Sequence, residues 1–304
     1  MNPNPPDPSR RLFLHTLLAS GLAGIATSVP AVALAGPRDR VASRDRNRST
    51  GQSLNSSAAS VEAGPTEEAR ETLRSSPIGP AAVAAERSLE LLRKVPGYIT
   101  TLIKREQFKS GAAVVPHTML MKLRRDPFSV YFKFIEPHAG REVLYVEGQN
   151  KGKLMVHEGS GLASWVGTVS LAPSADKVME ENRYPITMAG LEKGLAQLLA
   201  RWAKEAPHGE ANVRQADKVE VAGIACELLE VVHPTSRPHF PMHKVQLLIN
   251  PETKLPVRLA GYGYPARAGA EPPLMEEYTY QNLRTDVALR DIDFDVNNRS
   301  YKFK

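Results

Sequence analysis

The first half of the folded region alternates short apolar runs with turn residues. Between Tyr98 and His157, five runs rich in β-branched and aromatic side chains are separated by turn signals such as Lys109-Ser-Gly and Arg125-Asp-Pro. Runs of this length at hairpin spacing predict antiparallel strands that follow one another along the chain. The predicted strands span residues 98–108, 118–124, 129–135, 143–147 and 154–157.

The same spacing resumes in the last third of the chain. Turn signals at Ala222-Gly223 and at residues 251–256 separate several further runs. The strands predicted there span residues 211–215, 218–221, 224–232, 243–250, 255–264 and 274–283. The chain therefore predicts about eleven strands, which is enough for one large sheet.

Two segments have helical periodicity instead. Residues 82–95 form an amphipathic pattern that Pro96-Gly97 ends, and residues 175–181 predict a turn or two of helix. Between Thr187, a candidate N-cap, and Pro207, apolar residues fall on one helical face. These residues are Leu191, Leu195, Leu198, Leu199 and Trp202. The pattern favours the α+β class, with one large, strongly curved antiparallel sheet and helices at two points along the chain.

Composition limits the class of protein further. The 304 residues are 42% hydrophobic and 24% charged, with a mean hydropathy of −0.31, which excludes a multispan membrane protein. Large apolar side chains are nearly absent from residues 36–80, which predicts a disordered linker before one domain at residues 81–304. The net charge of +6 is spread over both signs, unlike the dense basic face of a nucleic-acid binder.

The N-terminus resembles a cleaved export signal. Arg10 and Arg11 precede residues 12–29, which carry no charged side chain, and Ala33-Leu34-Ala35 offers the small residues that signal peptidase accepts. The arginine pair predicts a twin-arginine signal at residues 1–35; an ordinary Sec signal and a retained anchor helix remain as alternatives. After cleavage the chain is expected to be periplasmic or otherwise exported, and not an integral membrane protein.

The chain is expected to fold without a disulfide bond. Cys226 is the only cysteine, so no intramolecular disulfide can form, and no cysteine is available near the cleavage region for lipid modification. Cys226 lies in an apolar run, where a small buried strand residue is a simpler interpretation than a nucleophile.

Several stretches resemble a known bacterial family. They include residues 125–148, beginning Arg125-Asp-Pro-Phe, together with Asn182-Arg-Tyr-Pro-Ile-Thr and Glu276-Glu-Tyr-Thr-Tyr. Over about residues 82–294 the chain resembles the family named domain of unknown function 1571. The order of its elements is also similar to that of LolA-type periplasmic lipoprotein carriers. That resemblance implies a half-open barrel whose apolar concave face holds acyl chains under a helical lid.

An acyl chain needs an apolar cavity and no catalytic groups, because each buried CH₂ contributes about 0.8 kcal/mol. The candidate cavity residues are Met119, Met121, Phe132, Phe134, Leu144, Met155, Leu195, Leu199 and Trp202. Each is equally compatible with an ordinary core position. The resemblance also implies an arginine in an early turn; Arg125 matches best, although Asp126 departs from the pattern and is expected to neutralise it.

Two polar groupings are candidates for chemistry. His233, His239 and His243 lie in one proline-rich stretch, which suggests either a metal site or a solvated loop. His138 and Arg141 lie around a tight turn, where Arg141 either binds an anionic head group or pairs with a neighbouring acid. No Walker loop, G-x-S-x-G elbow or H-E-x-x-H motif occurs.

The leading hypothesis from the sequence is a non-enzymatic carrier for a lipid, an acylated protein or another amphiphile, without a cofactor. Two alternatives remain: a metal-dependent hydrolase that uses the three histidines, and a sensor in which bound lipid changes the affinity for an envelope protein partner.

Overall fold

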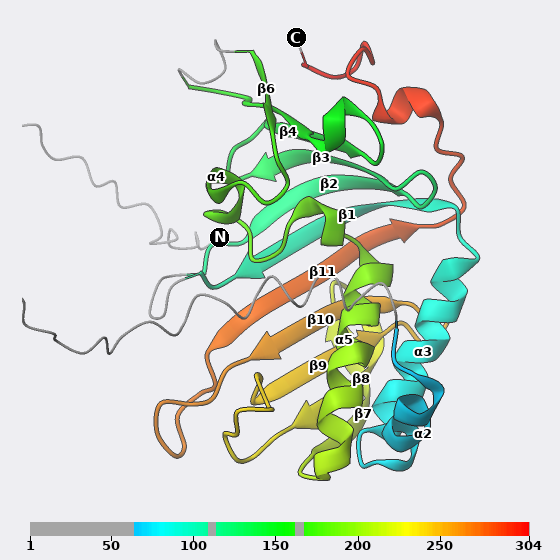
Figure 1. Cartoon of the computed structure of the whole chain (residues 1–304), viewed down its shortest axis with the longest axis vertical. Helices are drawn as coiled ribbons and strands as arrows, with labels where there is room; N and C mark the ends of the chain where they lie inside the picture. The colour runs from blue at the N-terminus through cyan, green and yellow to red at the C-terminus, as the bar shows by residue number, and fades with distance from the viewer. Residues whose placement is uncertain (1–63, 109–113, 162–166, 304) are drawn as a thin grey trace, which may run out of the picture. The chain divides into compact units, whose positions relative to one another are not determined.

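Eleven antiparallel strands form a single sheet in this computed structural model, which describes residues 64–108, 114–161 and 167–303 (Figure 1). The strands are β1 Gly97–Glu106, β2 His117–Arg124, β3 Ser129–Glu136, β4 Glu142–Val146, β5 Leu154–His157, β6 Thr168–Leu171, β7 Asn212–Val221, β8 Ile224–Val232, β9 Lys244–Ile249, β10 Pro256–Tyr262 and β11 Leu274–Arg284. The predicted α+β class is confirmed, and the number of strands agrees with the prediction. Two predicted strands, at residues 211–215 and 218–221, are however one strand, β7, and β6 was not predicted.

The strand order joins the two halves of the chain through one pair of strands. The order is β6-β5-β4-β3-β2-β1-β11-β10-β9-β8-β7, so every neighbour except the β1–β11 pair is also consecutive in sequence. Successive hairpins account for this order, because antiparallel neighbours need only short turns between them. A strong curl of the sheet stays a prediction.

Two long helices cover one face of the sheet (Figure 1). Helix α3 spans Gly79–Arg93, with Pro80 in its first turn, and α5 spans Leu191–Glu205. The predicted N-cap Thr187 is wrong: residues Ile186–Met188 form the short 3₁₀ helix η3, and α5 begins after Gly190, whose φ is +104°. A Cβ at this glycine would lie 2.5 Å from Leu123 Cδ1, so glycine relieves both crowding and backbone strain.

The described domain begins earlier than the sequence predicts. Helix α2 spans Glu67–Ser75, and the Thr66 side chain accepts a hydrogen bond from the N–H of Ala69 at its start. Leu73 is fully buried within the main core. The prediction of a disordered linker at residues 36–80 is therefore wrong for its last part, which is helical. One buried leucine anchors this otherwise polar helix to the core.

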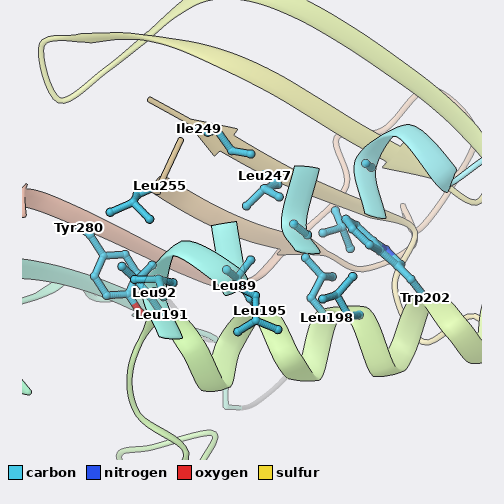
Figure 2. Close-up of a cluster of buried hydrophobic side chains, with 14 of the residues drawn as sticks. Leu89, Leu92, Leu191, Leu195, Leu198, Trp202, Leu247, Ile249, Leu255 and Tyr280 are labelled. Carbon is cyan, nitrogen blue, oxygen red and sulfur yellow. The ribbon is translucent and has the colours of Figure 1, made fainter. Parts of the chain in front are cut away.

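The main core lies between the helices and the sheet. Figure 2 shows leucines of α3 and α5 pointing towards side chains of β9 and β11. Trp202 of α5 is fully buried there. The labelled members of this core are Leu89, Leu92, Leu191, Leu195, Leu198, Trp202, Leu247, Ile249, Leu255 and Tyr280.

A second core lies on the opposite face of the strands β3 and β4. It consists of Tyr131, Leu144, Val146, Phe294 and Phe303, so the C-terminal segment covers this face. Residues Asp291–Phe294 form the 3₁₀ helix η5. This helix is attached to β2 by ion pairs from Lys122 to Asp293 at 2.8 Å and from Arg124 to Asp291 at 2.5 Å.

The remaining helical pieces are short: α4 Asp176–Met179, η1 Asn150–Gly152 and η4 Ala206–His208. Among the helices of the described residues, none combines the length and apolar character that a membrane span requires.

Candidate functional site

A cavity of about 230 Å³ lies between the helix-covered face of the sheet and the segment that runs from α4 into α5. Side chains alternate across a strand, so residues two apart share one face. On β1 this puts Leu102, Lys104 and Glu106 in the lining, and on β11 Glu276, Tyr278 and Tyr280. The apolar lining from other elements includes Met119, Phe132, Phe134, Val143, Leu154, Val156, Ile186, Leu195, Leu198 and Val245.

Of the nine cavity residues predicted from the sequence, four line this cavity: Met119, Phe132, Phe134 and Leu195. Three others, Met121, Leu199 and Trp202, are buried in the adjacent core and do not line it.

The last two predicted lining residues, Leu144 and Met155, lie on the face of the sheet opposite to the cavity. They oppose each other across β4 and β5 and pack into the second core. Their neighbours Val143 and Leu154 line the cavity instead. A shift of one position moves a strand residue to the other face, which accounts for the error.

One end of the cavity is a network of paired charges. Glu106 and Glu276, each 6% exposed, oppose each other across β1 and β11. Tyr278 donates a hydrogen bond of 2.5 Å to Glu106, and Lys104 lies 3.2 Å from the same carboxylate. Burial costs a carboxylate its hydration, and these contacts replace it.

Residues of the segment before α5 supply a hydrogen bond and an ion pair to Glu276. Tyr184 donates to its Oε2 at 2.8 Å, and Arg183 Nε lies 3.0 Å from the same oxygen. Burial, together with the charge of Glu276, raises the pKa of Tyr184 to about 12, so its hydroxyl stays protonated at neutral pH. Arg201 of α5 also lines the cavity and approaches the other oxygen, Oε1, at 3.7 Å.

The predicted head-group residue Arg141 is paired with two acids. Its Nε donates to Glu158 at 2.9 Å and its Nη1 to Glu181 at 2.6 Å. Burial acts to raise the pKa of Glu181, but the hydrogen bond and charge of Arg141 outweigh it, so the pKa is lowered. Arg141 thus fastens the segment after α4 to the sheet, which corresponds to its alternative interpretation as a partner of neighbouring acids.

His138 lies outside the cavity lining, with its ring centroid 5.9 Å from that of His117. His117 of β2 does line the cavity. Burial, and then electrostatic repulsion from Lys104 and His138, lower the pKa of His117 to about 4. His117 is therefore neutral at physiological pH.

Arg125 joins three elements rather than facing the cavity. Its guanidinium donates to the carbonyl of Leu92 at the end of α3 and lies 3.3 Å from Glu192 of α5. The expected neutralising partner Asp126 is replaced by Glu192. Arg125 therefore fixes both helices to the β2–β3 turn.

The three histidines proposed as metal ligands are engaged separately. His233 Nε2 lies 3.1 Å from Glu205, His243 Nδ1 lies 2.9 Å from the carbonyl of His233, and His239 stacks on His208. Across the part of the chain that the structure describes, no three His, Cys, Asp or Glu side chains form a group that could hold a metal ion. The described side chains therefore do not support the alternative of a metal site at these residues.

Cys226 is fully buried in β8, and burial raises the pKa of its thiol. A thiolate is the reactive form, so this position suits a packing role.

Sequence reasoning missed the polar end of the cavity. The lining residues of this end are Lys104, Glu106, Tyr184, Arg201, Glu276 and Tyr278, and Arg183, which does not line the cavity, pairs with Glu276. A signal did exist, because Lys104 and Glu106 follow Leu102 at two-residue spacing on the strand face that Leu102 buries.

These features define a class of protein: an antiparallel sheet with helices on one face and an apolar cavity with a charged end between them. The family model of a protein of unknown function, DUF1571, matches residues 95–303, which is more than half of the chain. The chain therefore belongs to this family, as its sequence motifs predict. No curated protein matches the chain.

Several solved structures are distantly similar. MucB in its complex with MucA from Pseudomonas aeruginosa is 14% identical, with a TM-score of 0.39 over 71% of this chain and 60% of that chain. The lipoprotein LppX from Mycobacterium tuberculosis is 14% identical, with a TM-score of 0.39 over 69% and 99%. A LolA superfamily protein from Nitrosomonas europaea is 12% identical, with a TM-score of 0.29 over 70% and 96%. The chain spans less than two thirds of the length of MucB.

Proposed function

We propose that this protein is a non-enzymatic carrier that holds one acyl chain, or an amphiphile of similar width, in its cavity. The observation that supports this is the apolar lining contributed by both the sheet and α5, including Met119, Phe132 and Leu195. Methionine suits such a ligand, because its flexible thioether adapts to chains of different shape.

The size of the cavity favours a slim ligand. Small-molecule pockets commonly have volumes of about 300–1,000 Å³, and this one is smaller at about 230 Å³. A single acyl chain fits that description better than a lipid with several chains. Each CH₂ removed from water stabilises the complex by about 0.8 kcal/mol, so an extended chain gains affinity along its length.

The experiment is a binding titration with a fluorescent fatty acid on two variants of one strand. Phe132→Asp puts a charge into the cavity lining, whereas Ile135→Asp, at a residue that is 51% exposed, is the matched control. We expect Phe132→Asp to weaken binding strongly and Ile135→Asp to leave it unchanged. Equal affinities for both folded variants would contradict the proposal.

The source of the acyl chain is open to direct measurement. Native mass spectrometry of the purified chain is expected to show a co-purified lipid or an acylated peptide. The two differ in mass, so the spectrum also separates free lipid from lipoprotein as cargo.

We also propose that the protein acts outside the cytoplasm. The motif that supports this, Arg10-Arg11 before an uncharged stretch, lies outside the described residues. Replacing both arginines by lysine blocks a twin-arginine signal while keeping the charge. Cell fractionation should then find the variant in the cytoplasm; normal export of the variant would favour an ordinary Sec signal.

A further inference from the structure

Of the two arginines that line the cavity, Arg201 has the weaker partner. Its side chain is 22% exposed, and its one ion pair among the described residues is with Glu276 Oε1 at 3.7 Å. No protein group within the described ranges forms a hydrogen bond with its guanidinium. By contrast Arg141, which is 12% exposed, has two hydrogen-bonded carboxylates.

Glu276 does not depend on Arg201. Its Oε2 already accepts the hydroxyl of Tyr184 and lies 3.0 Å from Arg183 Nε. A guanidinium carries several N–H donors in a rigid fork, and an anionic group that enters the cavity can accept them in place of water. The donors of Arg201 are therefore available to a group that enters the cavity.

The charges at this end of the cavity favour an anion. Lys104 is paired with Glu106, while Arg183 and Arg201 share the single carboxylate of Glu276. This leaves one net positive charge beside an apolar lining, where low polarity strengthens electrostatic attraction. Gln197, one helical turn before Arg201 on α5, also lines the cavity and adds an amide donor.

We propose that Arg201 binds the anionic head group, a carboxylate or a phosphate, of a single-chain amphiphile whose tail lies against Met119, Phe132 and Leu195. The planar fork of arginine matches the two oxygens that either group presents. This inference rests on the proposed carrier function and specifies the polar end of its ligand.

The test uses three ligands with the same tail: laurate, dodecyl phosphate and dodecanol. Their affinities for the whole protein are measured by calorimetry at mildly alkaline pH, where laurate is ionised. Arg201→Gln should weaken laurate and dodecyl phosphate by about tenfold or more, as expected for lost hydrogen bonds to a charged group. Dodecanol should keep its affinity.

Lys204 supplies a matched control, because it lies on the same helix, is exposed and does not line the cavity. Lys204→Gln removes the same charge and should change none of the three affinities. Arg201→Lys keeps the charge but loses the fork, so anion binding should fall by less than in Arg201→Gln. This second variant tests the proposal even where Arg201→Gln does not fold.

The outcomes distinguish a failure of the proposed role of Arg201 from a failure of the carrier function. Loss confined to one anion supports the proposal and assigns the head group as carboxylate or phosphate. Equal loss of all three ligands, or no loss of either anion, would overturn the role of Arg201 while leaving the carrier function intact. Failure of the wild-type protein to bind any of the three would overturn the carrier function itself.

Discussion

Glu106 and Glu276 are direct cross-strand neighbours on β1 and β11, and both carboxylates line the same cavity although each is only 6% exposed. Like charges placed opposite each other destabilise a sheet. The cations Lys104, Arg183 and Arg201 offset this repulsion. The arrangement makes one end of an apolar cavity both charged and ordered.

Glu276→Gln should therefore destabilise the fold. An amide cannot replace the charge that holds Arg183 and Arg201, and charge-assisted hydrogen bonds contribute about 1.5–3 kcal/mol each. Urea unfolding at neutral pH measures the loss.

The neighbouring residue provides the control for this substitution. Glu277 is equally buried, but it lies on the other face of β11 and its ion pairs with Arg105 and Arg258 are longer, at 3.5 and 3.8 Å. We expect a smaller loss for Glu277→Gln. A larger loss would mean that the cavity network is not the stronger of the two.

His117 should make the protein less stable in mild acid. Its pKa is lowered from 6.5 to about 4 on folding, mainly by burial, so the unfolded chain binds more protons in that interval. Stability consequently falls as the pH drops from about 6.5 towards about 4. Because the ring is only half-buried, solvent screening reduces the loss.

The measurement compares the free energy of unfolding at neutral pH and at about pH 5 for the wild type and His117→Gln. The variant should lose less stability over this interval than the wild type. His208, which is exposed, gives the control His208→Gln, and this variant should follow the wild type. Identical pH dependence in all three proteins would show that His117 is not the sensitive group.

Tyr98 should stabilise the start of α5 through a single hydrogen bond. Its Oη accepts the N–H of Leu191 at 3.0 Å, a donor that the helix itself leaves unpaired. Tyr98→Phe should cost about 0.5–1.5 kcal/mol. Tyr280 is similarly buried and forms no hydrogen bond through its hydroxyl among the described residues, so Tyr280→Phe should cost less. Equal costs in urea unfolding would contradict this role.

The sequence predicted most strands of the sheet, because local turn residues mark the short connections between β2 and β3, β3 and β4, β7 and β8, and β9 and β10. On β2 it also predicted Met119 and Met121, which share the buried face of the strand. Alternation fails on β4, since Val143 and Leu144 are both apolar. The cavity covers one of them and the C-terminal segment covers the other, and only the tertiary structure decides which.

The polar end of the cavity could not be assembled from local patterns. Glu106 and Glu276 meet through the one strand pair that is not consecutive in sequence, and Tyr184 reaches them from a connecting segment. Their register depends on how the two halves of the sheet join. The same holds for α2, a polar helix that packs against α3 and the distant α5 and buries Leu73 in the main core.

Leu199 and Leu195 should separate stability from ligand binding. Both belong to the main core, with exposed fractions of 5% and 2%, but only Leu195 lines the cavity. Truncating a buried leucine to alanine costs about 2–5 kcal/mol, so Leu199→Ala and Leu195→Ala should both lower the free energy of unfolding. Only Leu195→Ala removes apolar surface from the ligand, so only this variant should weaken laurate binding. Calorimetry on both folded variants measures the difference in laurate affinity. An equal loss of affinity in Leu199→Ala would mean that Leu199 lines the cavity, as its sequence pattern suggests.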